Sequence, residues 1–384
     1  MSQQPVVLIG SGLAGYGVAR ELRKLNSEIP ITMLSADHGG FYSKPMLSNA
    51  IATGKTPESI LNSSAAQMAN QLHITIRPDT RVSVIDSAQK AVVLENGEHL
   101  TYGQLVLAMG ADQIRLPLQG DGVADVLTVN DLDDYSHFRA ALEGKKQIAI
   151  LGAGLIGCEF ANDLVGAGYE VHVIDISTQP LGRLLPSEGG RFLQGKLTAI
   201  GIKFHLKTIT QRIDRMGDRL SLSFDDGTQL EVDLILSAVG LRPRIQLAQA
   251  AGIEVNRGIV TDRYLQTRTP DIYALGDCAE VEGKVLPFIM PISHASRALA
   301  VTLNGTPTLL RYPAMPVLVK TPACPTIVSP PDPDKEGEWR VDKTEDGIKA
   351  LFKDIAGNLL GFALLGDATK EKNALTPLLP AVLD

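Results

Sequence analysis

Residues 6–15 read VVLIGSGLAG, and residues 148–157 read IAILGAGLIG. Each stretch is a short apolar run that ends in the pattern G-x-G-x-x-G, which begins at Gly10 in the first copy and at Gly152 in the second. An apolar run that stops at a glycine predicts a buried parallel strand. The three glycines permit a tight turn, a close approach of the backbone to a pyrophosphate and close packing of the next helix. Because the free N–H groups at the start of that helix favour an anion, two copies predict two dinucleotide sites. One nucleotide can then pass electrons to the other.

An acidic residue follows each glycine pattern by about 20 residues, the distance at which a carboxylate reaches ribose hydroxyls. Asp37 follows the first pattern and Asp175 the second. A carboxylate at the second position accepts hydrogen bonds from an unphosphorylated ribose and repels a 2′-phosphate, which favours NADH over NADPH. Arg183 leaves the opposite choice open if its loop folds back toward a phosphate.

The composition excludes several classes of protein. The chain has 384 residues, 44% of them hydrophobic and 21% charged, with a net charge of −7. This length predicts two or three domains, and the acidic balance argues against nucleic acid as the main partner. The apolar stretches are only as long as strands, and no signal peptide precedes the first strand. We therefore expect no membrane insertion and a cytoplasmic location. The separated Cys158, Cys278 and Cys324 predict small buried residues rather than a disulfide framework.

The order of elements predicts an α/β fold with two Rossmann-like dinucleotide-binding domains, the second inserted in the first, and a small α+β C-terminal domain. We expect the first domain at residues 1–110 and 240–313, the second at 111–239 and the C-terminal domain at 314–384. A strand at 272–275 and a helix near 293–303 return the chain to the first domain. Prolines then cluster between positions 307 and 333, which marks the last boundary.

Four motifs in this order resemble the two-dinucleotide-binding flavoprotein reductases. They are GSGLAG, LAMGA, GAGLIG and YALGDCAE, and the resemblance covers about residues 1–310. It implies FAD in the first domain and NADH as electron donor in the second. The strand end before Gly110 usually reads ATG in this family. Here Met109 replaces the threonine, which removes one family contact but keeps the chain reversal that glycine provides.

The resemblance also implies which residues bind each cofactor. For FAD they are Gly10, Ser11, Gly12, Leu13, Ala14, Gly15, Asp37, Lys44, Val82, Gly110, Glu159, Gly276, Asp277 and Lys320. For NADH they are Gly152, Gly154, Leu155, Ile156, Gly157, Asp175 and Gly240. No metal is implied, and no side chain need act as an acid–base catalyst.

Four of these residues have roles of their own in the family, and each also has a purely structural alternative. Asp277 would bind the ribityl or pyrophosphate part of FAD, or else cap a helix. Lys44 and Lys320 would lie near the flavin, or else be solvated loop lysines. Glu159 would face the contact between flavin and nicotinamide, or else only stabilise the helix dipole.

Missing thiols narrow the chemistry further. Disulfide reductases and related peroxidases of this family carry cysteine in the early loop, where this chain reads FYSKPMLSNA at residues 41–50. That loop offers only Ser43 and Ser48, and the second domain contains only Cys158. Without a thiol relay, electrons must leave the flavin directly, and a one-electron carrier is the natural acceptor.

Within the thiol-free group, the strings YSKPMLSNA and YPAMPVLVKTPACP resemble the rubredoxin-reducing branch that supplies alkane hydroxylation. Reductases of ring-hydroxylating systems carry a lysine where this chain has Asn49. The partner implied is rubredoxin, which is acidic, so docking needs a basic patch. Lys44, Arg311 and Lys320 are candidates. The sequence is compatible with a monomer, and the oligomeric state stays open.

Three other functions remain open from the residues. The carrier could be a ferredoxin or the rubredoxin domain of a flavorubredoxin. The chain could instead be a redox-sensing protein that binds NADH and FAD. A membrane quinone reductase should carry a C-terminal amphipathic anchor, but Pro377 and Pro380 interrupt the short tail of this chain.

Overall fold

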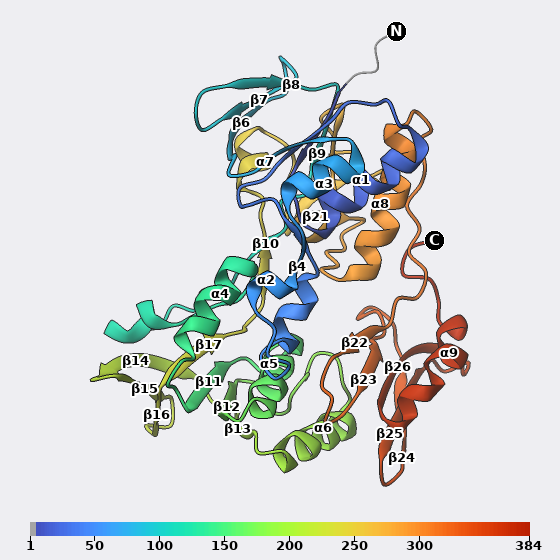
Figure 1. Cartoon of the computed structure of the whole chain (residues 1–384). Coiled ribbons are helices and arrows are strands. Elements are labelled where there is room, and N and C mark those ends of the chain that lie inside the picture. Colours follow the sequence, from blue (N-terminus) through green and yellow to red (C-terminus); the bar gives the residue numbers. More distant parts are fainter. Residues whose placement is uncertain (1–4) are drawn as a thin grey trace.

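The first nucleotide-binding pattern lies in a parallel sheet of order β20-β9-β1-β2-β5 (Figure 1) in the computed structural model, which describes residues 5–384. Its strands are β1 (Val6–Ile9), β2 (Ile31–Leu34), β5 (Thr75–Arg77), β9 (Gln104–Leu107) and β20 (Ile272–Ala274). The central strand β1 is buried on both faces, as its unbroken apolar run requires. Val6 and Leu8 pack against helices α1 (Leu13–Leu25) and α8 (Ile289–Leu303), which lie side by side. Val7 and Ile9 pack on the opposite face, toward β6 (Val82–Asp86), β7 (Ala91–Leu94) and β8 (His99–Thr101).

The second pattern repeats this plan. Strand β11 (Gln147–Leu151) lies inside a parallel sheet of order β13-β12-β11-β17, formed with β12 (Glu170–Asp175), β13 (Lys203–Leu206) and β17 (Leu234–Ser237). One face of β11 packs against α5 (Leu155–Gly166) and α6 (Ser187–Ala199). The other packs against a meander of β14 (Thr210–Met216), β15 (Arg219–Phe224) and β16 (Gln229–Val232). The sequence predicts neither β14 nor β16, because their exposed faces are polar and charged.

The second unit is inserted into the first. Strand β10 (Ala111–Gln113) leaves the first sheet and pairs antiparallel with the returning strand β18 (Leu241–Pro243). The chain then adds β20 to the edge of the first sheet, beside β9. The insertion that the sequence predicts is confirmed, and β10 with β18 forms a two-stranded ribbon that links the two units.

The C-terminal segment forms an antiparallel sheet of order β22-β23-β26-β25-β24. Its strands are β22 (Val317–Val319), β23 (Thr326–Ser329), β24 (Glu338–Lys343), β25 (Gly347–Lys353) and β26 (Leu359–Gly366). Val319, Val328 and Ile348 share a hydrophobic cluster with α5 and α6, so this sheet packs on the second unit. The chain end returns to the first unit, where the Tyr312 N–H donates to Leu383 O at 2.8 Å.

Shorter elements complete the fold. They are β3 (Phe41–Tyr42), η1 (Lys44–Asn49), α2 (Pro57–Ile60), β4 (Leu61–Ser63), α3 (Ala65–Leu72), β6 (Val82–Asp86), β7 (Ala91–Leu94), β8 (His99–Thr101), η2 (Asp121–Asp125), α4 (Leu132–Ala141), α7 (Gln246–Ala250), β19 (Ile259–Thr261), η3 (Gly276–Cys278), β21 (Ala279–Val281), η4 (Asp367–Glu371), α9 (Lys372–Leu375) and η5 (Thr376–Leu378). Within residues 5–384, no helix has the length and apolar character needed to cross a bilayer.

Candidate dinucleotide and electron-transfer site

The glycines of the first pattern divide into two kinds. A Cβ on Gly10 would lie 2.2 Å from Ala108 O, and a Cβ on Gly15 would lie 2.0 Å from Gly10 O. The fold itself therefore requires these two glycines. A Cβ on Gly12 would have no atom within 4 Å, and Gly12 caps α1 without a side-chain hydrogen bond. The start of α1 thus presents bare N–H groups to open space, which is the cradle that a pyrophosphate needs.

The second pattern has the same division. A Cβ on Gly152 would lie 2.6 Å from Ala238 O, and one on Gly157 would lie 1.9 Å from Gly152 O. A Cβ on Gly154, which caps α5, would meet no atom within 4 Å. Leu155 and Ile156 begin α5 directly after this glycine. The residues at both patterns fit a bound dinucleotide.

The two acidic residues lie at these helix starts. Asp37 accepts hydrogen bonds from Ser35 Oγ at 2.5 Å, from the Gly39 N–H at 2.8 Å and from Ser11 Oγ at 3.4 Å. Asp175 accepts from the N–H groups of Ala153 and Ser177, both at 2.6 Å. Each carboxylate is therefore oriented by groups of its own loop and of the adjacent glycine turn.

Lys44 and Asp277 come together from distant parts of the sequence. Lys44 begins η1, and its Nζ donates to Asn130 Oδ1 at 2.5 Å, while Asn130 Nδ2 donates to Ala111 O at 2.9 Å. Burial lowers the pKa of Lys44, and the nearby Asp277 carboxylate opposes this shift. Burial raises the pKa of Asp277, and Lys44 in turn opposes that. Lys44 is therefore not a solvated loop lysine. Asp277 lies inside η3 rather than at a helix cap.

Glu159 joins three parts of the chain. Its side chain is 2% exposed, and its Oε2 accepts from Ser48 Oγ at 2.5 Å and pairs with Lys320 Nζ at 2.6 Å. Its Oε1 accepts from the Lys320 N–H at 2.8 Å. Lys320 Nζ also donates to Pro45 O. The early loop, helix α5 and the C-terminal segment therefore meet at one buried carboxylate, and Lys320 is not a surface lysine.

The remaining predicted residues lie around these groups. Gly110 and Gly240 adopt φ angles of 72° and 117° at the ends of the β10–β18 ribbon. Val82 lies in β6 and packs against the hydrophobic cluster that contains Val7 and Ile9, on one face of the first sheet. Of the three docking cations, only Arg311 is exposed, because Lys44 and Lys320 bind partners inside the site.

Sequence reasoning missed three polar residues here. Asn130 orients Lys44, while Asn162 and Asp163 lie on the same face of α5 as Glu159. The signal available was that these two polar residues, like Glu159, interrupt the apolar run from Cys158 to Leu164 in this helix. Their partners, however, lie more than 100 positions away.

The described residues offer no thiol relay and no metal site. Cys158, Cys278 and Cys324 are all free and buried, as the sequence predicts. Burial raises the pKa of the Cys158 thiol, and it raises that of Cys278 to about 11. Within residues 5–384, no group of three His, Cys, Asp or Glu side chains is placed to bind a metal ion.

Comparison with known proteins agrees with this geometry. The family model for pyridine nucleotide-disulphide oxidoreductase matches residues 4–300, and that for the rubredoxin binding C-terminal domain matches residues 309–379. The chain is 47% identical to a rubredoxin-NAD(+) reductase from Alcanivorax borkumensis over 99% of both chains. It is 40% identical to a nitric oxide reductase FlRd-NAD(+) reductase from Aeromonas hydrophila, over 97% of this chain and 95% of that relative. It is also similar to the solved structure of a ferredoxin reductase from Rhodopseudomonas palustris. Their TM-score is 0.89 at 27% identity, over 98% of this chain and 96% of that one.

Proposed function

This chain belongs to the pyridine nucleotide-disulphide oxidoreductase family, and on that premise we propose that it transfers electrons from NADH through FAD to rubredoxin. One observation carries the proposal. The segment matched by the rubredoxin binding family model begins near β22 and contributes Lys320 to the buried carboxylate of the NADH helix. The carrier-binding part of the chain therefore contacts the electron-donating part at this ion pair, beside the hydrophobic cluster that the C-terminal sheet shares with α5 and α6.

Residues of the chain orient the two cofactors. The N–H groups at the start of α1 would bind the FAD pyrophosphate, Asp37 would accept from its adenosine ribose, and Lys44 and Asp277 would hold its ribityl and flavin parts. The start of α5 would bind the NADH pyrophosphate, and Asp175 would accept from its ribose. FAD supplies the acceptance of two electrons as hydride and their release one at a time. The Glu159–Lys320–Ser48 group would hold the early loop, α5 and the C-terminal segment together at the inner wall of the site.

We propose that the remaining residues predicted for each cofactor line its site. We also propose the domain bounds that the sequence predicts. These are 1–110 with 240–313 for FAD, 111–239 for NADH, and 314–384 for the carrier. Residues 1–4 lie outside the described structure. We also propose a cytoplasmic location, because the free buried thiols suit a reducing compartment. We further propose a role in supplying alkane hydroxylation, because the strings YSKPMLSNA and YPAMPVLVKTPACP resemble that branch of the family.

A comparison of carriers tests the proposal. The purified holoenzyme is supplied with NADH and, in turn, with rubredoxin, a ferredoxin and the isolated rubredoxin domain of a flavorubredoxin. We expect kcat/KM for rubredoxin to exceed that for ferredoxin by at least about tenfold, or 1.4 kcal/mol. The Aeromonas relative makes the flavorubredoxin domain the second candidate. Turnover of only a few per minute with every carrier would instead indicate a redox sensor and overturn the proposal.

A further inference from the structure

Helix α5 carries three buried polar residues on one face. Glu159, Asn162 and Asp163 are spaced i, i+3 and i+4, so their side chains project in the same direction. The other residues from Cys158 to Leu164 are apolar and buried. Glu159 is accounted for by its contacts with Lys320 and Ser48. Asn162 Oδ1 accepts from the Ala323 N–H at 3.1 Å, which attaches the C-terminal segment one turn further along α5.

Asp163 binds the early loop instead. Its two carboxylate oxygens accept from the Ile51 N–H at 2.8 Å and the Ala52 N–H at 3.1 Å. The residue is 6% exposed. The loop continues along the helix beyond this point, because a Cβ on Gly166 would lie 3.2 Å from Ala52 Cβ.

The far end of the same loop is bound by helix α4. Tyr135 Oη and Arg139 Nη1 both donate to Lys55 O, at 2.9 and 2.8 Å. Residues 48–55 are therefore bound at both ends by helices of the second nucleotide unit, α5 and α4, although this loop belongs to the first unit. The β10–β18 ribbon links the two units elsewhere, and a ribbon of two strands is a compliant connection on its own.

We propose that Asp163 is a positioning residue for hydride transfer: it fixes the loop that carries Lys44 and Ser48 against the NADH helix and so sets the separation of the two nucleotide sites. The inference rests on the proposed transfer of hydride from NADH to FAD. Such transfer requires a donor–acceptor separation near 3–3.5 Å, and a displacement of about 1 Å slows it by about 100-fold. A carboxylate is suited to this role because it accepts from two neighbouring N–H groups at once.

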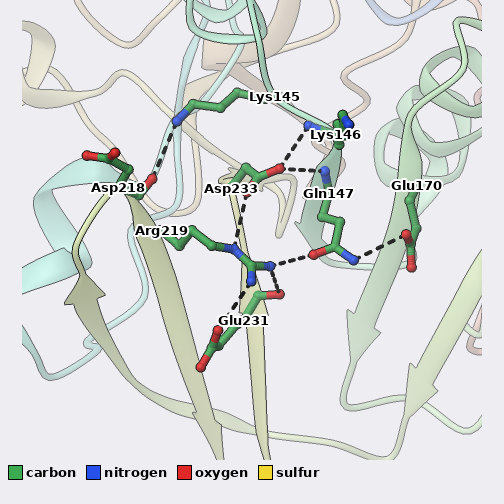
Figure 2. Close-up of polar contacts among 8 residues, drawn as sticks. All are labelled: Lys145, Lys146, Gln147, Glu170, Asp218, Arg219, Glu231 and Asp233. Carbon is green, nitrogen blue, oxygen red and sulfur yellow. Dashed lines mark hydrogen bonds and ion pairs between the residues drawn. The ribbon is translucent and has the colours of Figure 1, made fainter.

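The chain provides a matched control in Asp233. Its carboxylate also accepts from two consecutive N–H groups, those of Lys146 at 2.8 Å and Gln147 at 2.9 Å, and it pairs with Arg219 (Figure 2). All of these groups belong to the second unit: the two N–H groups lie at the start of β11, and Arg219 lies in β15. Removing the Asp233 carboxylate therefore loosens the second unit without releasing the early loop.

The test compares Asp163→Ala, Asp163→Asn and Asp233→Ala with the wild-type holoenzyme. Stopped-flow reduction by NADH gives the limiting rate of flavin reduction and the Kd for NADH separately. Amide hydrogen exchange of residues 48–54 gives a readout that does not depend on turnover. We expect Asp163→Ala to speed this exchange at least about tenfold and to slow flavin reduction by about 10- to 100-fold, with the Kd for NADH changed by less than about threefold.

The control and the conservative variant decide the interpretation. Asp163→Asn, which keeps one acceptor oxygen, is expected to recover part of the lost rate, and it serves as the main test if the alanine variant does not fold. Asp233→Ala is expected to lower the melting temperature but to leave the limiting rate within about twofold. The inference is wrong if Asp163 variants exchange faster yet reduce flavin at the wild-type rate, or if Asp233→Ala slows reduction equally. If wild-type flavin is not reduced by NADH at all, the proposed function fails first and this inference fails with it.

Discussion

Replacement of Lys320 by methionine should destabilise the protein through the carboxylate that it leaves behind. Lys320 Nζ lies 2.6 Å from Glu159 Oε2, and the Glu159 side chain is 2% exposed while that of Lys320 is 29% exposed. Removing one partner of a fully buried pair costs about 3–5 kcal/mol. Here Glu159 keeps the Ser48 hydroxyl and the backbone N–H of residue 320, and water reaches the lysine end. We therefore expect a loss of about 2–3 kcal/mol in the free energy of unfolding.

A double-mutant cycle isolates the contribution of the Lys320–Glu159 ion pair to the free energy of unfolding. Glu159→Gln removes the charge, and Lys320 keeps Pro45 O as an acceptor, so we expect a smaller loss of about 1–2 kcal/mol. The double variant should be no less stable than Lys320→Met alone, because no buried charge remains. The single tryptophan of the chain, Trp339 in β24, gives the fluorescence signal for urea unfolding of the C-terminal sheet at a fixed FAD concentration. A loss of 2–3 kcal/mol lowers the urea midpoint by about 1 M. The reasoning is refuted if the two single-variant losses simply add in the double variant.

Three further predictions follow from the site and its surroundings. Gly12→Ala should fold with a normal melting temperature yet lose at least about tenfold in FAD affinity, whereas Gly15→Ala should fail to fold. Flavin titration and thermal melting measure the two effects, and equal behaviour of the two variants would contradict the division of the glycines. Burial lowers the pKa of His172 and of His205, whose rings stack at 5.2 Å, so the folded protein binds fewer protons than the unfolded chain. The contribution of the two histidines to stability is then complete above about pH 6.5. It falls as the pH drops below that value, by up to about 1.4 kcal/mol per pH unit for each histidine. Urea midpoints at several pH values should fall less steeply for His205→Gln than for the wild type, and equal slopes would contradict this assignment. Cys158→Ser should retain full rubredoxin turnover, and a thiol reagent should label no cysteine of the native holoenzyme; rapid labelling with loss of activity would point to a thiol relay after all.

The parts of the fold that the sequence predicts correctly are those set by local sterics. A side chain on Gly15 would overlap the carbonyl of Gly10 within the same strand–turn–helix unit. A side chain on Gly10 would overlap the carbonyl of Ala108, at the end of the neighbouring strand β9. The duplicated order of elements, the insertion and the return of the chain at β20 follow from that unit and from the apolar runs around it. Strands β14 and β16 were missed because an exposed meander carries little hydrophobic periodicity.

The interior of the site could be predicted only in part. The resemblance brings Lys44, Glu159 and Lys320 to the same region, but it does not give their partners. Lys320 meets Glu159 across 161 positions of sequence, and Asp163 meets the early loop across 112. Such contacts depend on how three separate units pack, and no local propensity in α5 encodes them. The sequence predicts Lys44 and Lys320 as cations of a docking patch. In the structure Lys320 instead forms an ion pair with the buried Glu159, and the loop that carries Lys44 is bound by helices α4 and α5.

The most direct test of the central claim is sequential mixing in a stopped-flow instrument. The oxidised holoenzyme is first mixed with NADH, and the reduced enzyme is then mixed with oxidised rubredoxin while both chromophores are followed. We expect the flavin to bleach quickly in the first step and rubredoxin to bleach in the second, at no less than about 10 per second. The account would be contradicted if rubredoxin stayed oxidised after mixing with enzyme whose flavin is fully reduced.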